Sequence, residues 1–254
     1  MTEPIEKPRL ADTIAERLKA LVLEGALRPG ERLIEEPALA RTFGVSRSTV
    51  RDALGILEAK GLLVAGKTGY CVAPFLSGFA DPLTELLRDD DRASADYFEF
   101  RLILETDAAG LAALRATETD RARIRDCLDR MREAHELNDP SVEVEFDIRL
   151  HLAIYEATHN VVILHVLRTL AELMRKGAFV NKENLYRRVG VRDRLRLQYV
   201  KIGEAVLARD RRLAEAAAEE HVNFVREAYA AMLLDELRQA ATLRRFSRED
   251  IVAE

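Results

Sequence analysis

The chain contains no tryptophan and few of the residues that interrupt regular structure, with 12 glycines and 7 prolines among 254 residues. That scarcity excludes collagen-like and low-complexity proteins. Hydrophobic residues make up 48% and charged residues 33% of the chain, which is typical of a helix-rich globular protein with a packed core. The length allows one large domain or two of ordinary size.

Cysteine and long apolar runs are also scarce. Cys71 and Cys127 stand far apart, so they offer neither a metal-binding pair nor a disulfide framework, and we expect both to be small buried or half-buried residues in a reducing cytoplasm. No stretch reaches about 18 uncharged apolar residues, and residues 1–10 lack the basic start and apolar run of a secretory signal. We therefore expect a cytoplasmic protein that does not enter the membrane.

The N-terminal part has the pattern of a winged helix-turn-helix domain. The spacing of apolar residues predicts a helix over 10–25, a short helix over 36–42, and a third that follows Ser46 as its N-cap. Residues 62–74 contain two short β-prone runs around a glycine turn at 66–69, which predicts a wing-like hairpin.

The rest of the chain shows helical periodicity without a strand signal. The expected helices cover 92–116, 119–137, 142–158, 161–179, 191–208 and 211–237. The sequence therefore predicts a mainly α protein with two domains. Its parts are a winged helix-turn-helix domain over 1–74, a linker over 75–82, an all-helical bundle over 83–238 and a polar tail over 239–254.

The third predicted helix has the chemistry of a helix that reads DNA. The stripe expected to face the two supporting helices consists of Val50, Ala53, Leu54 and Leu57. The opposite face is then available to the major groove, where arginine pairs with guanine or with phosphate. The side chains offered to DNA are Ser46, Arg47, Ser48, Thr49 and Arg51, with Lys67 in the hairpin turn. An ordinary solvated helix face is the alternative interpretation of the two arginines.

A resemblance to the GntR family of bacterial transcription regulators is carried by Val45-Ser46-Arg47-Ser48-Thr49-Val50-Arg51-Asp52-Ala53-Leu54 and by Leu57-Glu58-Ala59-Lys60-Gly61-Leu62. It covers residues 14–72 and implies a DNA-binding regulator. The family's operator-contacting positions fall on Ser46, Arg47, Thr49 and Arg51, and the wing around Gly66 and Lys67 approaches the adjacent groove. Many relatives have Ser-Glu-Arg at the start of the second helix, whereas this chain has Glu35-Glu36-Pro37, a departure that changes the expected operator sequence.

Several polar residues of the helical part are expected to point inward. Asp147 and His151 stand four residues apart and share one helix face. His221 lies on a stripe with Leu213, Ala217, Phe224 and Ala228. Burying such groups without partners costs several kcal/mol, and a divalent metal such as zinc inside the bundle would compensate. The alternative is that each histidine makes a satisfied hydrogen bond in the core, as we expect for His135, His159 and His165 if they are not on the surface.

The helical part is similar to the FadR-type branch of the same family and its FCD ligand-binding domain across residues 97–229. The residues that carry this are Phe98-Glu99-Phe100-Arg101 with Glu105, Asp147-Ile148-Arg149-Leu150-His151, Thr158-His159-Asn160 and His221. Residues 160–170 are also similar to regulators that respond to pyruvate, lactate or glycolate, which implies a small hydroxy- or keto-acid effector.

The FCD resemblance also implies roles for individual residues. Metal would be held by Asp147, His151 and His221, while Tyr199 stands where metal-binding relatives have a further histidine. A phenol is a poor ligand because its ordinary pKa is about 10. Arg101 corresponds to the arginine that faces the effector pocket, so it is expected to hold the effector carboxylate, with Tyr199 closing over it. Pairing of Arg101 with Glu105 or another internal acid is the alternative.

Three functions were weighed. The leading hypothesis is a homodimeric regulator, a repressor, that binds a palindromic operator in double-stranded DNA and responds to a small carboxylate. A metal-dependent hydrolase is the second, although we find no candidate general base within a motif. The third is a DNA-binding dimer whose helical body has no effector.

Overall fold

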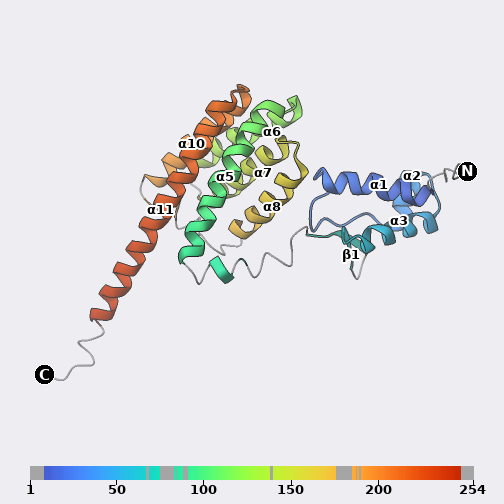
Figure 1. The fold of residues 1–254 in the computed structure, drawn as a ribbon, viewed down its shortest axis with the longest axis horizontal. Coiled ribbons are helices and arrows are strands. Elements are labelled where there is room, and N and C mark those ends of the chain that lie inside the picture. Colours follow the sequence, from blue (N-terminus) through green and yellow to red (C-terminus); the bar gives the residue numbers. More distant parts are fainter. Residues whose placement is uncertain are drawn as a thin grey trace, which may run out of the picture. The chain divides into compact units, whose positions relative to one another are not determined.

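The computed structural model describes residues 9–66, 69–74, 83, 85–87, 91–137, 140–175, 185–186, 188 and 190–246. The chain divides into two compact units, Met1–Phe79 and Ala80–Glu254. Helices make up most of the described residues in each unit, which confirms the predicted fold class (Figure 1). Lys67 and the predicted linker over 75–82 lie outside the described residues.

The first unit is a winged helix-turn-helix. Its elements are α1 (Leu10–Leu23), α2 (Glu36–Phe43), α3 (Arg47–Ala59), β1 (Leu63–Gly66) and β2 (Gly69–Val72). Helix α3 packs against both α1 and α2. The antiparallel hairpin pairs Leu63 with Val72 and Gly66 with Gly69. A bridge between Arg32 and Cys71 extends this sheet, and the sequence did not predict it because a single paired residue leaves no alternating pattern.

The turn between α2 and α3 is set by local chemistry. Gly44 has a φ of 66°, a left-handed conformation that costs a residue with a Cβ about 1 kcal/mol. The hydroxyl of Ser46 accepts a hydrogen bond from the Thr49 amide at 3.2 Å, which confirms Ser46 as the N-cap of α3. The predicted apolar stripe of α3 is buried, so Arg47 and Arg51 are left on the exposed face.

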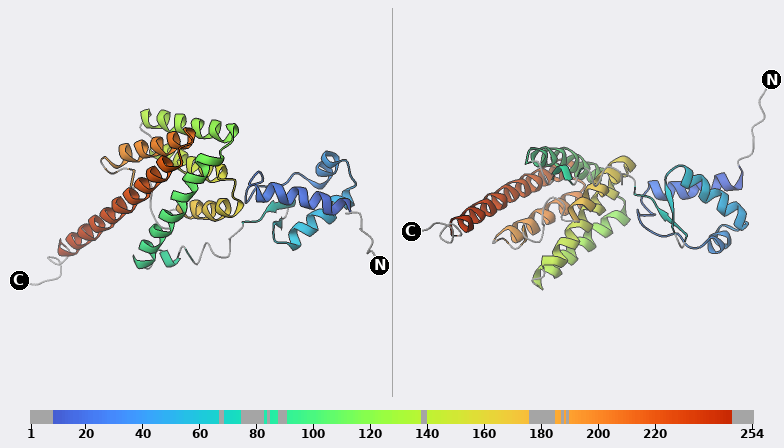
Figure 2. Two further views of the ribbon diagram at one scale, coloured as in Figure 1. Left: turned by 45° about the horizontal axis from the view of Figure 1, so that its top comes forward. Right: turned by 90° about the horizontal axis from the view of Figure 1, so that it is seen from below.

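The second unit is an all-helical bundle around one core (Figure 2). Its helices are α5 (Asp91–Arg115), α6 (Glu118–Glu136), α7 (Pro140–Ala157), α8 (Val161–Arg175), α10 (Val191–Leu207) and α11 (Arg211–Phe246). Helix α11 packs along α5 and α10, and α6 packs along α7 and α10. Among the described residues, every helix is too short or too polar to span a lipid bilayer.

Alanines bring α5 and α11 close together. The buried alanines of these two helices are Ala108, Ala109, Ala112, Ala113, Ala214, Ala217 and Ala218. Because the distance between packed helices depends on the size of the side chains at the contact, alanines allow the two backbones to approach closely. The polar side chains that α5 and α11 carry one or two turns further along are thereby held near each other.

Two sequence predictions about α11 were wrong. The helix was expected to end at Leu237, but it continues to Phe246. Leu213 was expected on the buried stripe, yet 55% of it is exposed, and Ala214 is buried instead. Leu213 lies in the first turn of the helix, where the bundle ends, so the burial stripe begins one residue later.

Candidate functional site

The exposed face of α3 gathers most of the residues predicted to contact DNA. Arg47 and Ser48 are exposed, Thr49 is half-buried, and the side chain of Arg51 is 69% exposed. The hydroxyl of Ser46 lies 2.8 Å from those of Ser48 and Thr49. The guanidinium of Arg51 donates from Nη2 to Glu36 Oε2 at 3.0 Å. This face therefore presents hydroxyl and guanidinium donors beside one carboxylate.

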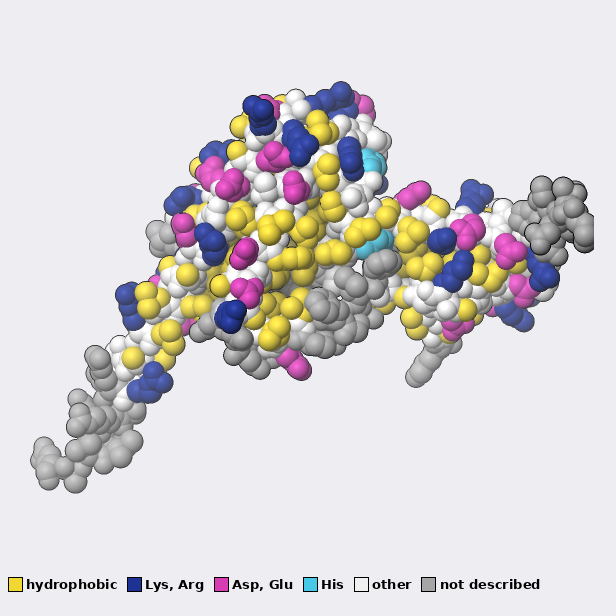
Figure 3. All heavy atoms as spheres, in the orientation of Figure 1, with side chains coloured by type: hydrophobic (Ala, Val, Ile, Leu, Met, Phe, Trp, Pro, Cys, Tyr) yellow, Lys and Arg dark blue, Asp and Glu magenta, His cyan; other side chains and the backbone are white. Residues whose placement is uncertain are grey.

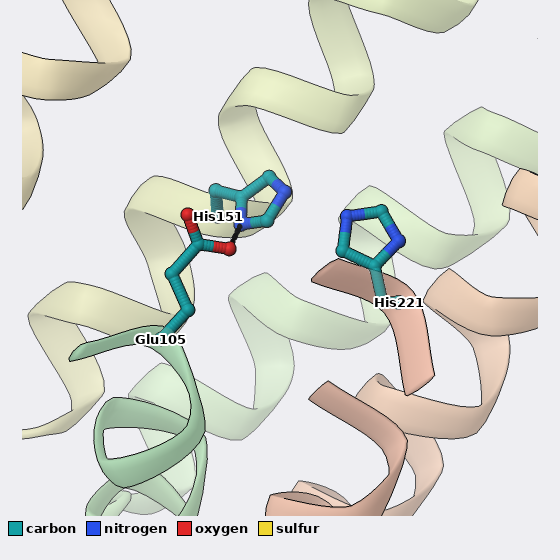
Figure 4. A group of neighbouring side chains, drawn as sticks. All are labelled: Glu105, His151 and His221. Carbon is teal, nitrogen blue, oxygen red and sulfur yellow. Dashed lines mark ion pairs between the residues drawn. The ribbon is translucent and has the colours of Figure 1, made fainter. Parts of the chain in front are cut away.

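A second group of polar residues is buried inside the helical bundle. Glu105 of α5, His151 of α7 and His221 of α11 point toward one another (Figure 4). Their candidate ligand atoms all lie within 4.8 Å of one another. Two members of this group, His151 and His221, were predicted as metal ligands, and Glu105 was not.

Asp147, the third predicted metal ligand, lies beside this group. Its Oδ1 is 3.3 Å from Nε2 of His151. Its carboxylate also accepts hydrogen bonds from the hydroxyls of Tyr186, at 3.4 Å, and Tyr199. His151 therefore stands between two carboxylates, since its Nδ1 lies 3.8 Å from Oε2 of Glu105.

Arg101 is paired with Glu105 in the interior, as the alternative interpretation of the sequence held. Its Nε and Nη2 donate to the two carboxylate oxygens at 2.6 Å and 3.2 Å. Burial disfavours the carboxylate, but the combined effect of Arg101, His151 and His221 lowers the pKa of Glu105 to about 2. Burial likewise disfavours the guanidinium, and Glu105 outweighs it, so the pKa of Arg101 is raised. Both groups are charged at neutral pH.

His221 presents a nitrogen lone pair to the centre of the group. Its Nδ1 lies 3.3 Å from Oε1 of Gln198, and a carbonyl oxygen only accepts, so Nδ1 carries the proton and Nε2 does not. Burial, with smaller effects from His151 and Arg101, lowers the pKa of His221 to about 3. The ring is therefore neutral at physiological pH, which is the form that binds metals.

Tyr199 lies against both histidines. Its ring centroid is 4.7 Å from that of His221 and 5.7 Å from that of His151. Burial, followed by the charge of Asp147, raises the pKa of Tyr199 well above its ordinary value. The phenol therefore stays protonated and acts as a hydrogen-bond donor rather than as an anionic ligand.

Arg101 Nη1, His151 Nε2 and His221 Nε2 are among the buried atoms of this region that lack a hydrogen-bond partner within the described part of the chain. Leaving such groups unsatisfied costs about 1–3 kcal/mol each. Two imidazoles beside an ionised carboxylate suit a divalent cation. The remaining N–H of Arg101 suits an anion. The donors present thus fit a metal ion together with a small acid.

Sequence reasoning missed several members of this site. Glu105 was considered as a partner of Arg101, which stands four residues before it, but not as a metal ligand. Tyr155 stands four residues after His151 on the same helix, a comparable signal, and its hydroxyl lies 3.2 Å from His151 Nδ1. Gln198 and Tyr186 carried no such signal because each contacts a residue of another segment.

The other histidines have separate contacts. His159 is 48% exposed and its Nε2 lies 2.9 Å from Asp120. His135 lies between Glu143 and Asp193. His165 is buried in α8. None of these contacts joins the group around Glu105.

Comparison with known proteins identifies both units. Residues 10–69 match the family described as bacterial regulatory proteins, gntR family, and residues 96–224 match the FCD domain. A relative from Escherichia coli (strain K12), whose name refers to regulation of the L-lactate dehydrogenase operon, is 32% identical over 93% of this chain and 92% of its own. The Glc operon transcriptional activator of the same strain is 31% identical over 87% of this chain and 89% of its own.

A third relative, the HTH-type transcriptional regulator LutR of Bacillus subtilis (strain 168), is 32% identical over 82% of this chain and 95% of its own. These relatives and both matching families are regulatory proteins, so the hydrolase hypothesis has no support among them. The chain belongs to the gntR family of bacterial regulatory proteins and is a DNA-binding transcription regulator with a C-terminal FCD domain.

Proposed function

We propose that this regulator responds to a small carboxylate metabolite bound inside the FCD domain beside Arg101. The observation that carries the proposal is the buried guanidinium of Arg101, whose Nη1 has no hydrogen-bond partner among the described residues. A buried site with a fixed cation favours a compact anion over a neutral sugar or a long acyl chain. The names of relatives that refer to the L-lactate dehydrogenase and Glc operons support a hydroxy- or keto-acid.

An effector carboxylate would have to share Arg101 with Glu105 or replace it. Glu105 accepts hydrogen bonds from Nε and Nη2. An incoming acid would therefore bind Nη1 first and then compete with Glu105 for the other two donors. We propose that Tyr199, which packs against His151 and His221, closes over the acid. Such an exchange alters the contacts of α5 and provides the two states that a ligand can bias.

We also propose that a divalent metal, zinc by its preference for imidazole and carboxylate, binds at this site. Asp147, His151 and His221 are the proposed ligands, and Glu105 is a further candidate because its carboxylate meets both histidines. A bound metal would supply a positive charge to the oxygens of the effector. We expect weak retention because Tyr199 is a neutral phenol.

For the DNA-binding end, we propose an operator-binding domain over 1–74, joined by a linker over 75–82 to an effector-binding and dimerisation domain over 83–238. The proposed operator contacts are Ser46, Arg47, Ser48, Thr49, Arg51 and Lys67. Two such domains in a homodimer would read a palindromic operator in the cytoplasm, with binding that weakens steeply as salt rises. We propose repression that the acid relieves.

The experiment measures melting temperature across a panel of organic acids, with and without zinc, followed by release of operator DNA by the same acids. A ligand that prefers the folded state raises the melting temperature. We expect stabilisation by a hydroxy- or keto-acid and release of operator at matching concentrations. Stabilisation only by acyl-thioesters or neutral compounds would contradict the proposed pocket, and tighter operator binding with acid would contradict relief of repression.

A further inference from the structure

Helix α3 is joined to α2 by an ion pair between Arg51, a predicted DNA contact, and Glu36, which was not predicted to contact DNA. Glu36, the first residue of α2, lies 15 positions before Arg51 in the chain, and its Oε2 accepts hydrogen bonds from Arg51 Nε at 3.3 Å and Nη2 at 3.0 Å. The side chains of Arg51 and Glu36 are 69% and 29% exposed. The pair thus lies on the surface offered to DNA and links the two helices of the helix-turn-helix.

Fold stability does not account for this pair. Exposed ion pairs contribute little to stability because the charges remain in water and two long side chains must be immobilised. A carboxylate on this surface also repels the phosphates of DNA, so Glu36 lowers electrostatic affinity for every sequence. As an acid in the first turn of α2, Glu36 stabilises that helix modestly, but this position does not require a hydrogen bond to Arg51, which calls for another explanation.

The geometry of the guanidinium provides one. Its five N–H groups lie in one plane, so a carboxylate that binds the Nε and Nη2 edge fixes the direction of the whole group. The edge formed by Nη1 and Nη2 donates to no other described residue and is oriented by Glu36 before DNA arrives. Guanine offers O6 and N7 to such an edge in the major groove. Preorganisation reduces the entropy lost when an arginine side chain binds.

We propose that Glu36 is a positioning residue that orients Arg51 toward one guanine of the operator and so raises specificity while lowering general affinity. This inference rests on the proposed contact of Arg51 with the operator. That contact is tested separately, because Arg51→Ala should abolish preference at this base pair whether or not Glu36 has any role.

The chain offers a matched control. Glu35 is the neighbouring acid, is exposed, and caps α2 without a side-chain hydrogen bond. Glu35→Ala therefore removes the same charge from almost the same place without releasing Arg51. Glu36→Ala removes both the charge and the acceptor, whereas Glu36→Gln keeps a carbonyl oxygen that can still accept from Arg51.

The operator is first selected by the full-length protein from a pool of random duplexes. Fluorescence anisotropy then gives affinities for this operator, for a scrambled duplex and for operators substituted at the guanine that depends on Arg51. Melting temperatures confirm that the variants fold. We expect Glu36→Ala to reduce the operator-to-scrambled affinity ratio roughly tenfold, with partial recovery in Glu36→Gln, while Glu35→Ala raises both affinities by the same factor.

A double-mutant cycle separates positioning from direct contact. In the Arg51→Ala background, Glu36→Ala should leave the affinity ratio unchanged. A further loss in that background would overturn the inference because Glu36 would then act on DNA itself, for example by accepting from cytosine N4. An unchanged or increased ratio for Glu36→Ala alone would equally overturn it.

Discussion

Arg101 has an internal partner, Glu105, with which the proposed acid effector would compete for the guanidinium. Arg101→Lys keeps the positive charge but loses the planar fork that binds Glu105 through two donors. We expect this variant to need roughly tenfold more acid for half-release of operator, corresponding to about 1.4 kcal/mol. Operator affinity without acid should stay unchanged. The measurement is operator release against acid concentration for parent and variant.

Arg149→Lys is the matched control, because Arg149 is exposed and pairs with Glu145 on the surface. It should respond like the parent. If Arg101→Lys also responded like the parent, Arg101 would be a structural partner of Glu105 and not an effector contact.

Metal retention distinguishes the two carboxylates beside His151. We expect Tyr199→His to tighten retention, since an imidazole would replace a phenol against His221. Asp147→Asn and Glu105→Gln should each weaken it, the larger loss marking the carboxylate that binds the metal. Metal content after dialysis, per mole of protein, gives the result for each variant. Stoichiometric retention that survives His221→Ala would show that the ligands are placed wrongly.

Among individual residues of the site, the sequence predicted the buried histidines better than it predicted the side chains that contact them. His221 and Asp147 were predicted inward because each repeats with apolar residues of its own helix. Glu105 lies beside them because α5 packs against α7 and α11. This packing joins segments that are distant in the sequence, so the periodicity of one helix does not predict it. Two of the three metal-candidate residues in the group were therefore found from sequence.

Two glycines at helix contacts test how tightly the elements pack. A Cβ on Gly203 of α10 would lie 2.6 Å from Cδ1 of Leu128, which is buried in the core between α6 and α10. A Cβ on Gly110 of α5 would instead meet Glu215 at 2.4 Å, whose side chain is 26% exposed and can move toward water. We expect Gly203→Ala to lower the free energy of unfolding by about 1–3 kcal/mol and Gly110→Ala to lower it less.

Urea unfolding of both variants checks this difference. We expect both to show a similar dependence of the free energy of unfolding on urea concentration, because each exposes nearly the same surface on unfolding. Equal losses would mean that Glu215 is held as firmly as Leu128. Such a result would place a rigid polar contact at the α5–α11 interface.

The elements themselves were largely predictable because their ends carry chemical signals. Ser46 caps α3, Gly44 ends α2, and the hairpin turns at glycine. The end of α11 was not predicted because residues 238–246 contain neither glycine nor proline, the residues that commonly mark a helix end. The expected end at Leu237 rested on the polar composition of the residues that follow. Helix formers can continue a helix into solvent without a buried face, so polarity alone does not mark the end.

At the scale of the whole molecule, the FCD domain carries exposed apolar residues that could form the interface of the proposed homodimer. Exposed apolar residues follow one side of α5 at Phe100, Ile103 and Leu114, and Val162 of the neighbouring α8 is 66% exposed. Figure 3 shows hydrophobic side chains gathered over α5 and toward α8. Such contiguous patches mark interaction sites in soluble proteins.

If the homodimer forms through this surface, Ile103→Asp should raise the dimer dissociation constant at least tenfold, because it places a charge in an apolar contact. Sedimentation equilibrium gives the constant. Leu137→Asp is the control, since Leu137 is 77% exposed on the turn after α6. Dimers of unchanged strength in Ile103→Asp would exclude this face as the interface.

The tyrosines described around the FCD site have an optical consequence. The chain has six tyrosines and no tryptophan, so no indole accepts their excitation energy or masks their emission. Tyr155, Tyr186 and Tyr199 are buried and contact His151, Asp147 or His221, and Tyr97 is buried near Arg101. Four of the six tyrosines therefore lie in or beside this site, so we expect an acid or a metal that binds there to change the intrinsic tyrosine fluorescence of the unlabelled protein.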